Sequence, residues 1–237
     1  MNIFFASNIV GDVLEFDEEE IRHLQVLRYN RADQIQVVDG KGNWYVAELV
    51  DLSKKRALAK VIERNSSVQR KPYHLHLAIA PTKNIDRLEW FLEKATEIGV
   101  DEITPTLCRN SERTQVRLDR LEKILLSAMK QSLKVFLPKL NPLTPLKTFI
   151  QEQENFVGQK CIAWISDPPG KLLQQTYIPA QNVIVVIGPE GDFAPDEIEL
   201  AQQHNFVPVS LGQSRLRTET AGVVAVHTIE LMNGSVP

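Results

Sequence analysis

The 237-residue sequence has few of the features that mark membrane and secreted proteins. No apolar run is long enough to cross a bilayer, and the N-terminal stretch MNIFFASNIVGDVLEF lacks the basic and apolar regions of a signal peptide. The two cysteines, Cys108 and Cys161, are isolated from each other and match no metal-binding spacing. We therefore expect a protein of the reducing cytoplasm with no membrane association.

Common nucleotide-binding and catalytic motifs are also absent. The loop Gly188-Pro189-Glu190-Gly191 has neither the Gly-Lys-Ser/Thr ending of a phosphate-binding loop nor the Gly-x-Gly-x-x-Gly of a dinucleotide fold. His74 and His76 alternate onto one face of an expected strand, but no third metal ligand accompanies them. No Ser-His-Asp or Cys-His arrangement stands out, and we expect no metal.

The charge distribution is uneven along the chain. A net charge of −3 speaks against a general affinity for nucleic acid. Residues 109–139, however, hold eight Lys and Arg against three Asp and Glu, whereas residues 151–237 hold four against ten. A solvated helix face would explain the basic segment, and so would a local patch on which phosphate docks.

Residues 1–70 have the pattern of a small β-domain. Two β-rich runs at 34–39 and 44–50 flank a glycine-containing loop, which predicts a hairpin, and a further strand follows at 57–63. A short helix is expected at 18–27. The polar stretch 66–72 marks a domain boundary, so we predict a β-barrel domain at 1–70 and a second domain at 73–237.

The second domain alternates strand and helix patterns, which is typical of an α/β fold with a mostly parallel sheet. The expected strands are 75–80, 102–106, 161–165, 183–187 and 207–211. The expected helices are 85–98, 118–129, one that begins at Pro195, and 219–232.

Two glycine-containing loops follow expected strands, and ligands of open α/β sheets bind at the carboxyl ends of strands. One loop is 188–191 and the other is 211–221, with the sequence LGQSRLRTETA. An ordinary strand-to-helix turn would also contain glycine, and helix capping explains the Thr and Glu residues of the second loop. It does not explain Arg217, a positive charge at a helix N-terminus. The residues alone predict a nucleotide-type ligand on an α/β fold.

Four motifs in the same order resemble the SPOUT methyltransferases, and most closely the ribosomal RNA small-subunit methyltransferase E family, which methylates N3 of a uridine in 16S rRNA. They lie at 23–28 with 34–40, at 83–90 with 94–100 and 103–105, at 131–132 with Pro138, and in the two glycine loops. The resemblance implies an N-terminal PUA-like, RNA-binding β-barrel and a C-terminal trefoil-knotted α/β domain. It also implies a homodimer, S-adenosylmethionine as cofactor and the small ribosomal subunit as partner.

The resemblance also assigns residues. The cofactor pocket is expected to comprise Ile165, Ser166, Gly188, Pro189, Glu190, Gly191, Leu211, Gly212, Leu216, Arg217 and Thr220. From the chemistry of N3 methylation, and not from the resemblance, we expect Arg217 to stabilise charge on the uracil carbonyl oxygens, with Glu190, Glu219 or solvent accepting the N3 proton. RNA is expected to contact Arg22, Arg28, Arg31, Arg109, Lys130 and Lys134.

Two positions depart from the family pattern. Asp192 stands where a glycine is expected, and Lys134 where an arginine is expected, which removes a bidentate contact to phosphate. Three alternatives stay open at this point: a non-catalytic RNA-binding or ribosome-assembly factor, a SPOUT methyltransferase that acts on another RNA, and a small-molecule α/β enzyme.

Overall fold

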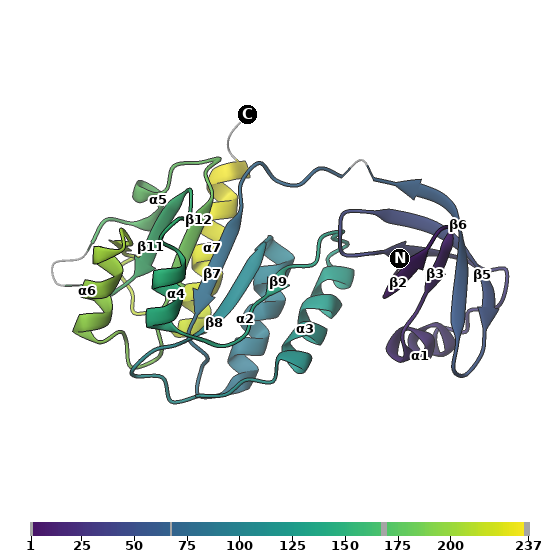
Figure 1. Ribbon diagram of the computed structural model, residues 1–237, viewed down its shortest axis with the longest axis horizontal. Coiled ribbons are helices and arrows are strands. Elements are labelled where there is room, and N and C mark those ends of the chain that lie inside the picture. Colours follow the sequence, from purple (N-terminus) through teal and green to yellow (C-terminus); the bar gives the residue numbers. More distant parts are fainter. Residues whose placement is uncertain (1, 67, 167–169, 235–237) are drawn as a thin grey trace. The chain divides into compact units, whose positions relative to one another are not determined.

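A computed structural model describes residues 2–66, 68–166 and 170–234. The chain forms two compact units. One contains residues 1–70 together with 129–137, and the other contains residues 71–128 together with 138–237. The units are described separately below (Figure 1).

The N-terminal unit is a six-stranded curled sheet around an apolar core. Its strand order is β1 (Ile3–Phe5), β4 (Gln34–Val38), β5 (Trp44–Leu52), β6 (Ala57–Asn65), β3 (Val13–Glu15) and β2 (Asn8–Val10). Phe4, Leu14 and Leu49 are fully buried inside it. Among the described residues no pairing joins the edge strands β1 and β2, so the predicted barrel is an open half-barrel.

The predicted hairpin and helix of this unit are both present. Strands β4 and β5 pair antiparallel, with Val38 opposite Trp44. Helix α1 (Glu18–Val26) begins where the Asp17 carboxylate accepts the backbone N–H groups of Glu19 and Glu20.

Residues 129–137 add a second chain segment to this unit, which the single predicted boundary at 66–72 did not include. The Lys130 ammonium pairs with the carboxylate of Glu20, which is 1% exposed. Backbone N–H groups of Gly42 and Leu137 donate to the carbonyls of Val135 and Gly40, each at 2.9 Å. Gly42 has a φ of +104°, and a Cβ there would lie 2.5 Å from the Phe136 ring.

The C-terminal unit contains a seven-stranded sheet in which every pairing of the described residues is parallel, where the sequence predicted a mostly parallel sheet and five of its strands. The main order is β10 (Thr144–Pro145), β8 (Glu102–Leu107), β7 (Leu75–Ile79), β12 (Val183–Ile187), β11 (Gln159–Ala163) and β13 (Val207–Val209). Strand β9 (Lys139–Leu140) also pairs with β8. Every residue of β7 and β12 is buried, as expected of central strands that are covered on both faces.

Helices cover both faces of this sheet (Figure 1). Helix α7 (Thr218–Gly234) packs against β7, β12, α2 (Ile85–Ile98) and α5 (Leu173–Thr176). Helices α4 (Leu146–Glu152) and α6 (Pro195–Gln203) pack against each other on the face that contains Ile184 and Val186. Helix α3 (Leu118–Gln131) follows β8 along the chain.

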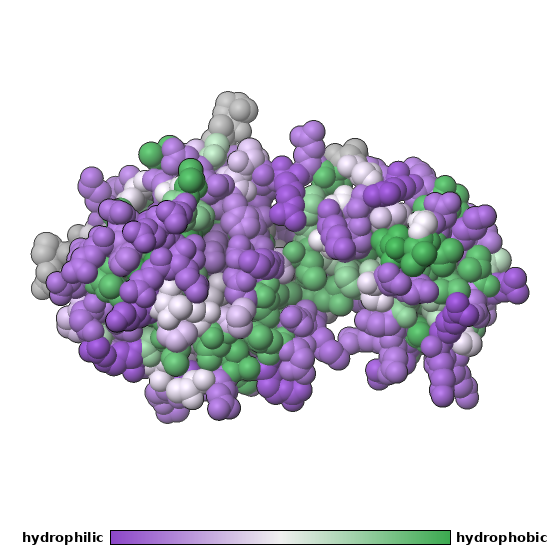
Figure 2. Space-filling model, in the orientation of Figure 1, coloured by the Kyte–Doolittle hydropathy of each residue, from purple (hydrophilic) through white to green (hydrophobic). Residues whose placement is uncertain are grey.

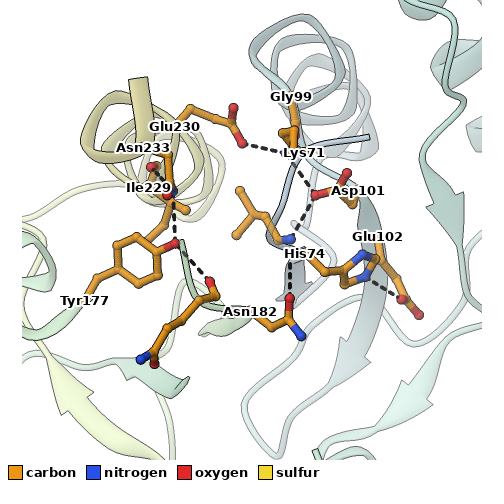
Figure 3. Close-up of polar contacts among 12 residues, drawn as sticks. Lys71, His74, Gly99, Asp101, Glu102, Tyr177, Asn182, Ile229, Glu230 and Asn233 are labelled. Carbon is orange, nitrogen blue, oxygen red and sulfur yellow. Dashed lines mark hydrogen bonds and ion pairs between the residues drawn. The ribbon is translucent and has the colours of Figure 1, made fainter. Parts of the chain in front are cut away.

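A polar network closes the amino-terminal edge of the sheet (Figure 3). The Lys71 ammonium contacts the carboxylates of Asp101 at 2.9 Å and Glu230 at 2.6 Å, and it donates to the carbonyl of Gly99 at the end of α2. The Asp101 carboxylate also accepts a hydrogen bond from the backbone N–H of Leu75 at 2.9 Å. The network fixes the ends of α2 and α7 at the edge opposite the carboxyl-end loops.

Hydrophilic side chains cover most of the face shown in Figure 2, and apolar side chains also gather over the N-terminal strands. Within the described parts of the chain, no helix combines the length and apolar character needed to cross a membrane.

Candidate cofactor and RNA site

Three loops meet at the carboxyl edge of the parallel sheet. Strands β12, β11 and β13 are neighbours, and Ala163 at the end of β11 lies opposite both Ile187 and Val209. The segments that follow these strands are 188–191, 164–166 and 210–217. The structure therefore brings the three predicted walls of the cofactor pocket together at adjacent strand ends, where α/β sheets bind ligands.

The segment after β13 crosses the sheet edge before α7 begins. It starts beside β11 at Val209, and the Thr218 hydroxyl donates to the carbonyl of Gly188 at 3.0 Å, at the end of β12. This crossing lies where the resemblance places the trefoil knot. It holds the start of α7, with Thr220 in its first turn, against the Gly188 loop.

The crossing segment presents backbone groups and apolar side chains for a ligand. Among the described residues, the N–H groups of residues 213–216 have no hydrogen-bond partner. Gly212 has a φ of +137°, a conformation that favours glycine. A Cβ at this position would meet no atom within 4 Å. Leu211 and Leu216 are half-buried, and Ile165 on the neighbouring loop is 64% exposed.

The backbone of the Gly188–Gly191 loop lies close to neighbouring side chains. A Cβ on Gly188 would lie 2.9 Å from the ring of Phe193, and one on Gly191 would lie 3.0 Å from the Cβ of Asn110. The Asn110 amide donates to the carbonyls of Gly191 and Asp192. The glycines therefore keep this loop close to its neighbours.

Asp192, the departure from the family pattern, adopts a φ of +60°, which Asp tolerates better than most residues. Its carboxylate accepts the backbone N–H of Phe193 at 2.8 Å. Partial burial raises the pKa of Asp192, and the Phe193 hydrogen bond and the charge of Arg215 oppose that rise. The left-handed backbone of the loop is thus kept without glycine.

The two predicted catalytic residues differ in their surroundings. Arg217 is exposed at the end of the crossing segment. Glu219 is 7% exposed, and its Oε1 lies 3.8 Å from the Arg87 Nε. The Glu219 Oε2 is buried without a hydrogen-bond partner among the described residues. Glu190, the other predicted proton acceptor, accepts the backbone N–H of Lys83 at 3.0 Å.

An open hollow of about 330 Å³, which no sequence pattern indicated, lies beside the Gly188–Gly191 loop. It is lined by Lys83, Asn84, Arg87, Glu112 and Glu190. The segment 83–90 belongs to a recognised motif, but the pairing of Arg87 with Glu219 joins positions 132 residues apart and depends on the fold.

The six predicted RNA-binding residues divide between the two units. Arg22, Arg28 and Arg31 are exposed on α1 and the turn that follows it. Lys130 is 17% exposed and is bound to Glu20, and Lys134 is half-buried in the same unit. The Arg109 guanidinium, in the C-terminal unit, pairs with Asp196. The structure therefore gives Lys130 a buried structural partner, which the sequence did not indicate.

The described part of the chain contains no group of three or more His, Cys, Asp or Glu side chains that could hold a metal ion. His74 pairs with Glu102 at 3.0 Å, and His76 with the Thr104 hydroxyl at 2.7 Å.

Two family models match successive parts of the chain. A family model described as an RNA methyltransferase domain matches residues 69–230, and one described as an RNA methyltransferase PUA domain matches residues 16–62. The chain belongs to this RNA methyltransferase family. The fold class predicted above, an α/β methyltransferase domain after a small PUA-like β-domain, is confirmed.

Relatives of this RNA methyltransferase are similar over nearly their full lengths. The ribosomal RNA small subunit methyltransferase E of Buchnera aphidicola is 30% identical, over 98% of this chain and 93% of the relative. A crystal structure of a probable rRNA-methyltransferase from Porphyromonas gingivalis is 37% identical, with a TM-score of 0.89 and 99% coverage of both chains. The Neisseria gonorrhoeae ribosomal RNA small subunit methyltransferase E, solved bound to S-adenosyl methionine, is 29% identical, with a TM-score of 0.84 and 98% coverage of both.

Proposed function

We propose that this chain uses S-adenosylmethionine to methylate N3 of a uridine in the 16S rRNA of the small ribosomal subunit. The observation that carries the proposal is the meeting of the loops 164–166, 188–191 and 210–217 at adjacent carboxyl ends. Similarity to ribosomal RNA small subunit methyltransferases over 94–98% of this chain supports the choice of substrate.

The residues of this edge fit the cofactor. The side chains of Ile165, Leu211 and Leu216 offer apolar surface for an adenine ring. The unpartnered N–H groups of 213–216 offer hydrogen bonds to its polar edge. Ser166, Thr220 and the Gly188–Gly191 loop complete the proposed pocket. When bound, S-adenosylmethionine supplies a methyl group that is already activated by the sulfonium.

Residues of the chain must then prepare uridine N3. N3 is a poor nucleophile until its proton leaves, so a positive group near the uracil carbonyl oxygens would favour the reaction. We assign this role to Arg217. We assign the proton acceptor to Glu219, whose Oε2 has no hydrogen-bond partner among the described residues, with Glu190 and solvent as the alternatives.

RNA would reach this site with the target base unpaired, because N3 lies on the Watson–Crick edge. We assign backbone contacts to Arg22, Arg28 and Arg31, and we place RNA binding in a domain spanning 1–70 and catalysis in one spanning 73–237. The proposal includes action as a cytoplasmic homodimer. Arg109 and Lys134 are further candidate phosphate contacts, whereas Lys130 already pairs with Glu20.

The test is methyl transfer from labelled S-adenosylmethionine to four acceptors. These are small ribosomal subunits that lack their native methylation, free 16S rRNA, transfer RNA, and a nucleoside mixture. Label in either ribosomal acceptor supports the proposal. Label in transfer RNA or nucleosides alone would favour another substrate, and cofactor binding without transfer would favour an assembly factor.

A further inference from the structure

A second open hollow of about 340 Å³ adjoins the first. It is lined by Lys83, Glu112, Arg113, Thr114 and Gln115, so the two hollows share Lys83 and Glu112. Both volumes fall in the range of small-ligand sites. The first hollow also contains Glu190, a residue of the proposed cofactor loop.

The shared wall is an ion pair. The Lys83 ammonium lies 2.7 Å from the Glu112 carboxylate, and the two side chains are 72% and 54% exposed. Such a pair is weak, because water competes with it and two long side chains must be ordered. An incoming anion can therefore replace Glu112 as the partner of Lys83.

The backbone around this ion pair is held firmly, unlike the ion pair itself. The Arg113 guanidinium donates to the carbonyls of Thr82 at 3.0 Å and Lys83 at 2.7 Å. The backbone N–H of Lys83 donates to Glu190. These contacts fix the position of the Lys83 backbone between the hollows and leave its ammonium free to change partners.

The first hollow is also lined by a second cation, Arg87. Arg87 is 40% exposed there, and its one charged partner among the described residues is Glu219 at 3.8 Å, beyond normal hydrogen-bond length. A nucleotide in this hollow would lie between Arg87 and the loop that ends β12.

We propose that the two hollows hold two consecutive nucleotides of the RNA substrate and that Lys83 exchanges Glu112 for the phosphodiester between them. One nucleotide occupies the hollow beside Glu190, and its neighbour occupies the hollow beside Arg113. This inference rests on the proposed function, because it assumes an RNA substrate. Glu112 acts as an internal competitor for the RNA phosphate.

The exchange predicts opposite effects for the two members of the pair. With unmodified 16S rRNA as the probe in a filter-binding assay, Lys83→Ala should raise the Kd about tenfold, since it removes a charged hydrogen bond. It should also lower the slope of log K against log salt by about one. Glu112→Gln should lower the Kd about threefold, since it removes the competing exposed partner.

Two further variants control for the change in net charge. Glu93→Gln removes an exposed carboxylate that pairs with Lys94 at 2.7 Å on α2, and it should change the Kd less than Glu112→Gln does. In Lys83→Ala/Glu112→Gln, the gain from Glu112→Gln should disappear, because no ammonium remains to be released. In all of these variants the Kd for S-adenosylmethionine, measured by calorimetry, should stay within twofold of the wild-type value.

Weaker RNA binding by Glu112→Gln, or an equal gain in the Lys83→Ala background, would overturn the exchange. These outcomes leave the proposed function standing as long as the wild-type protein methylates ribosomal RNA. A wild-type protein that binds 16S rRNA but transfers no methyl group would instead overturn the proposed function.

Discussion

Arg217 is placed at the junction of the proposed cofactor loop and α7, exposed beside a helix N-terminus that disfavours its charge. Its backbone carbonyl accepts the N–H of Ala221 at 2.8 Å, so the backbone has a structural role that most substitutions keep. The side chain has no such role among the described residues. Its position is better explained by a reacting group with developing negative charge.

Arg217→Ala should therefore lower kcat for methyl transfer by roughly 100-fold, since one charge-stabilising donor is lost from the transition state. The Kd for S-adenosylmethionine should rise by less than about threefold, because backbone groups hold the cofactor in this account. Arg215→Ala, which removes the same charge from the same loop, is the matched control and should retain transfer. Equal losses in transfer and cofactor binding would assign Arg217 to cofactor binding or structure.

The sequence indicated the loops of the proposed site better than it indicated the partners of their residues. Gly188 and Gly212 were recognisable because glycine marks the loop at a strand end. Helix capping was the sequence-based explanation for the Thr residues of the second loop, but the Thr218 hydroxyl donates to the carbonyl of Gly188. The pairing of Glu219 with Arg87, and of Glu190 with the Lys83 backbone, depends on the order of strands in the sheet. Local sequence carries no signal for that order.

At the scale of elements, α3 and the segment after it connect the two compact units. The apolar spacing of the sequence predicted a helix at 118–129, and the observed helix α3 is Leu118–Gln131. The basic residues of segment 109–139 were compatible with either a solvated helix face or a patch for phosphate. In the structure Arg120 pairs with Glu89 on α2, and Lys130 pairs with buried Glu20. Ion pairs between distant segments decide what each cation does, and helical spacing does not show them.

Lys130→Met should destabilise the protein by about 3 kcal/mol, because it leaves the Glu20 carboxylate buried without its partner. Burial already raises the pKa of Glu20, and Lys130 opposes that rise. The double variant Glu20→Gln/Lys130→Met should recover part of the loss, since no charge is left buried. Urea unfolding measures both effects.

Lys134→Met, on the same segment but only half-buried, is the control for Lys130→Met and should cost less. If Lys130→Met has the same urea midpoint of unfolding as the wild type, the ion pair does not stabilise the packing of residues 129–137 within the N-terminal unit.

At the scale of the whole molecule, the chain separates a small β-unit from a parallel α/β unit whose central strands are completely buried. The alternation of apolar strands and amphipathic helices predicted the parallel sheet. The strand order, and the short elements α4, β9 and β10, could not be predicted, because they are too short to show a period.

Burial inside this sheet makes stability depend on pH. His76 is 5% exposed, and burial lowers its pKa to about 4 from an unfolded value near 6.5. As the pH falls, His76 is therefore protonated in the unfolded state before it is protonated in the folded state. The contribution of neutral His76 to the free energy of unfolding is complete above pH 6.5 and is lost towards pH 4. Between pH 7.5 and pH 5 the loss from this residue should be about 2 kcal/mol.

The measurement is the free energy of unfolding in urea at these two pH values, for the wild type and for His76→Gln. Glutamine keeps a polar group for the Thr104 hydroxyl but does not titrate. The variant should lose clearly less stability on acidification than the wild type does. Identical pH dependence would show that His76 does not control it.

The central claim is that the carboxyl-edge loops form the active site of a uridine-N3 methyltransferase. The most direct test is nucleoside mass spectrometry of 16S rRNA from methylation-deficient small subunits after incubation with the protein and S-adenosylmethionine. The account predicts 3-methyluridine with the wild type and its near absence with Arg217→Ala. A different methylated nucleoside, or 3-methyluridine at equal levels with both proteins, would contradict it.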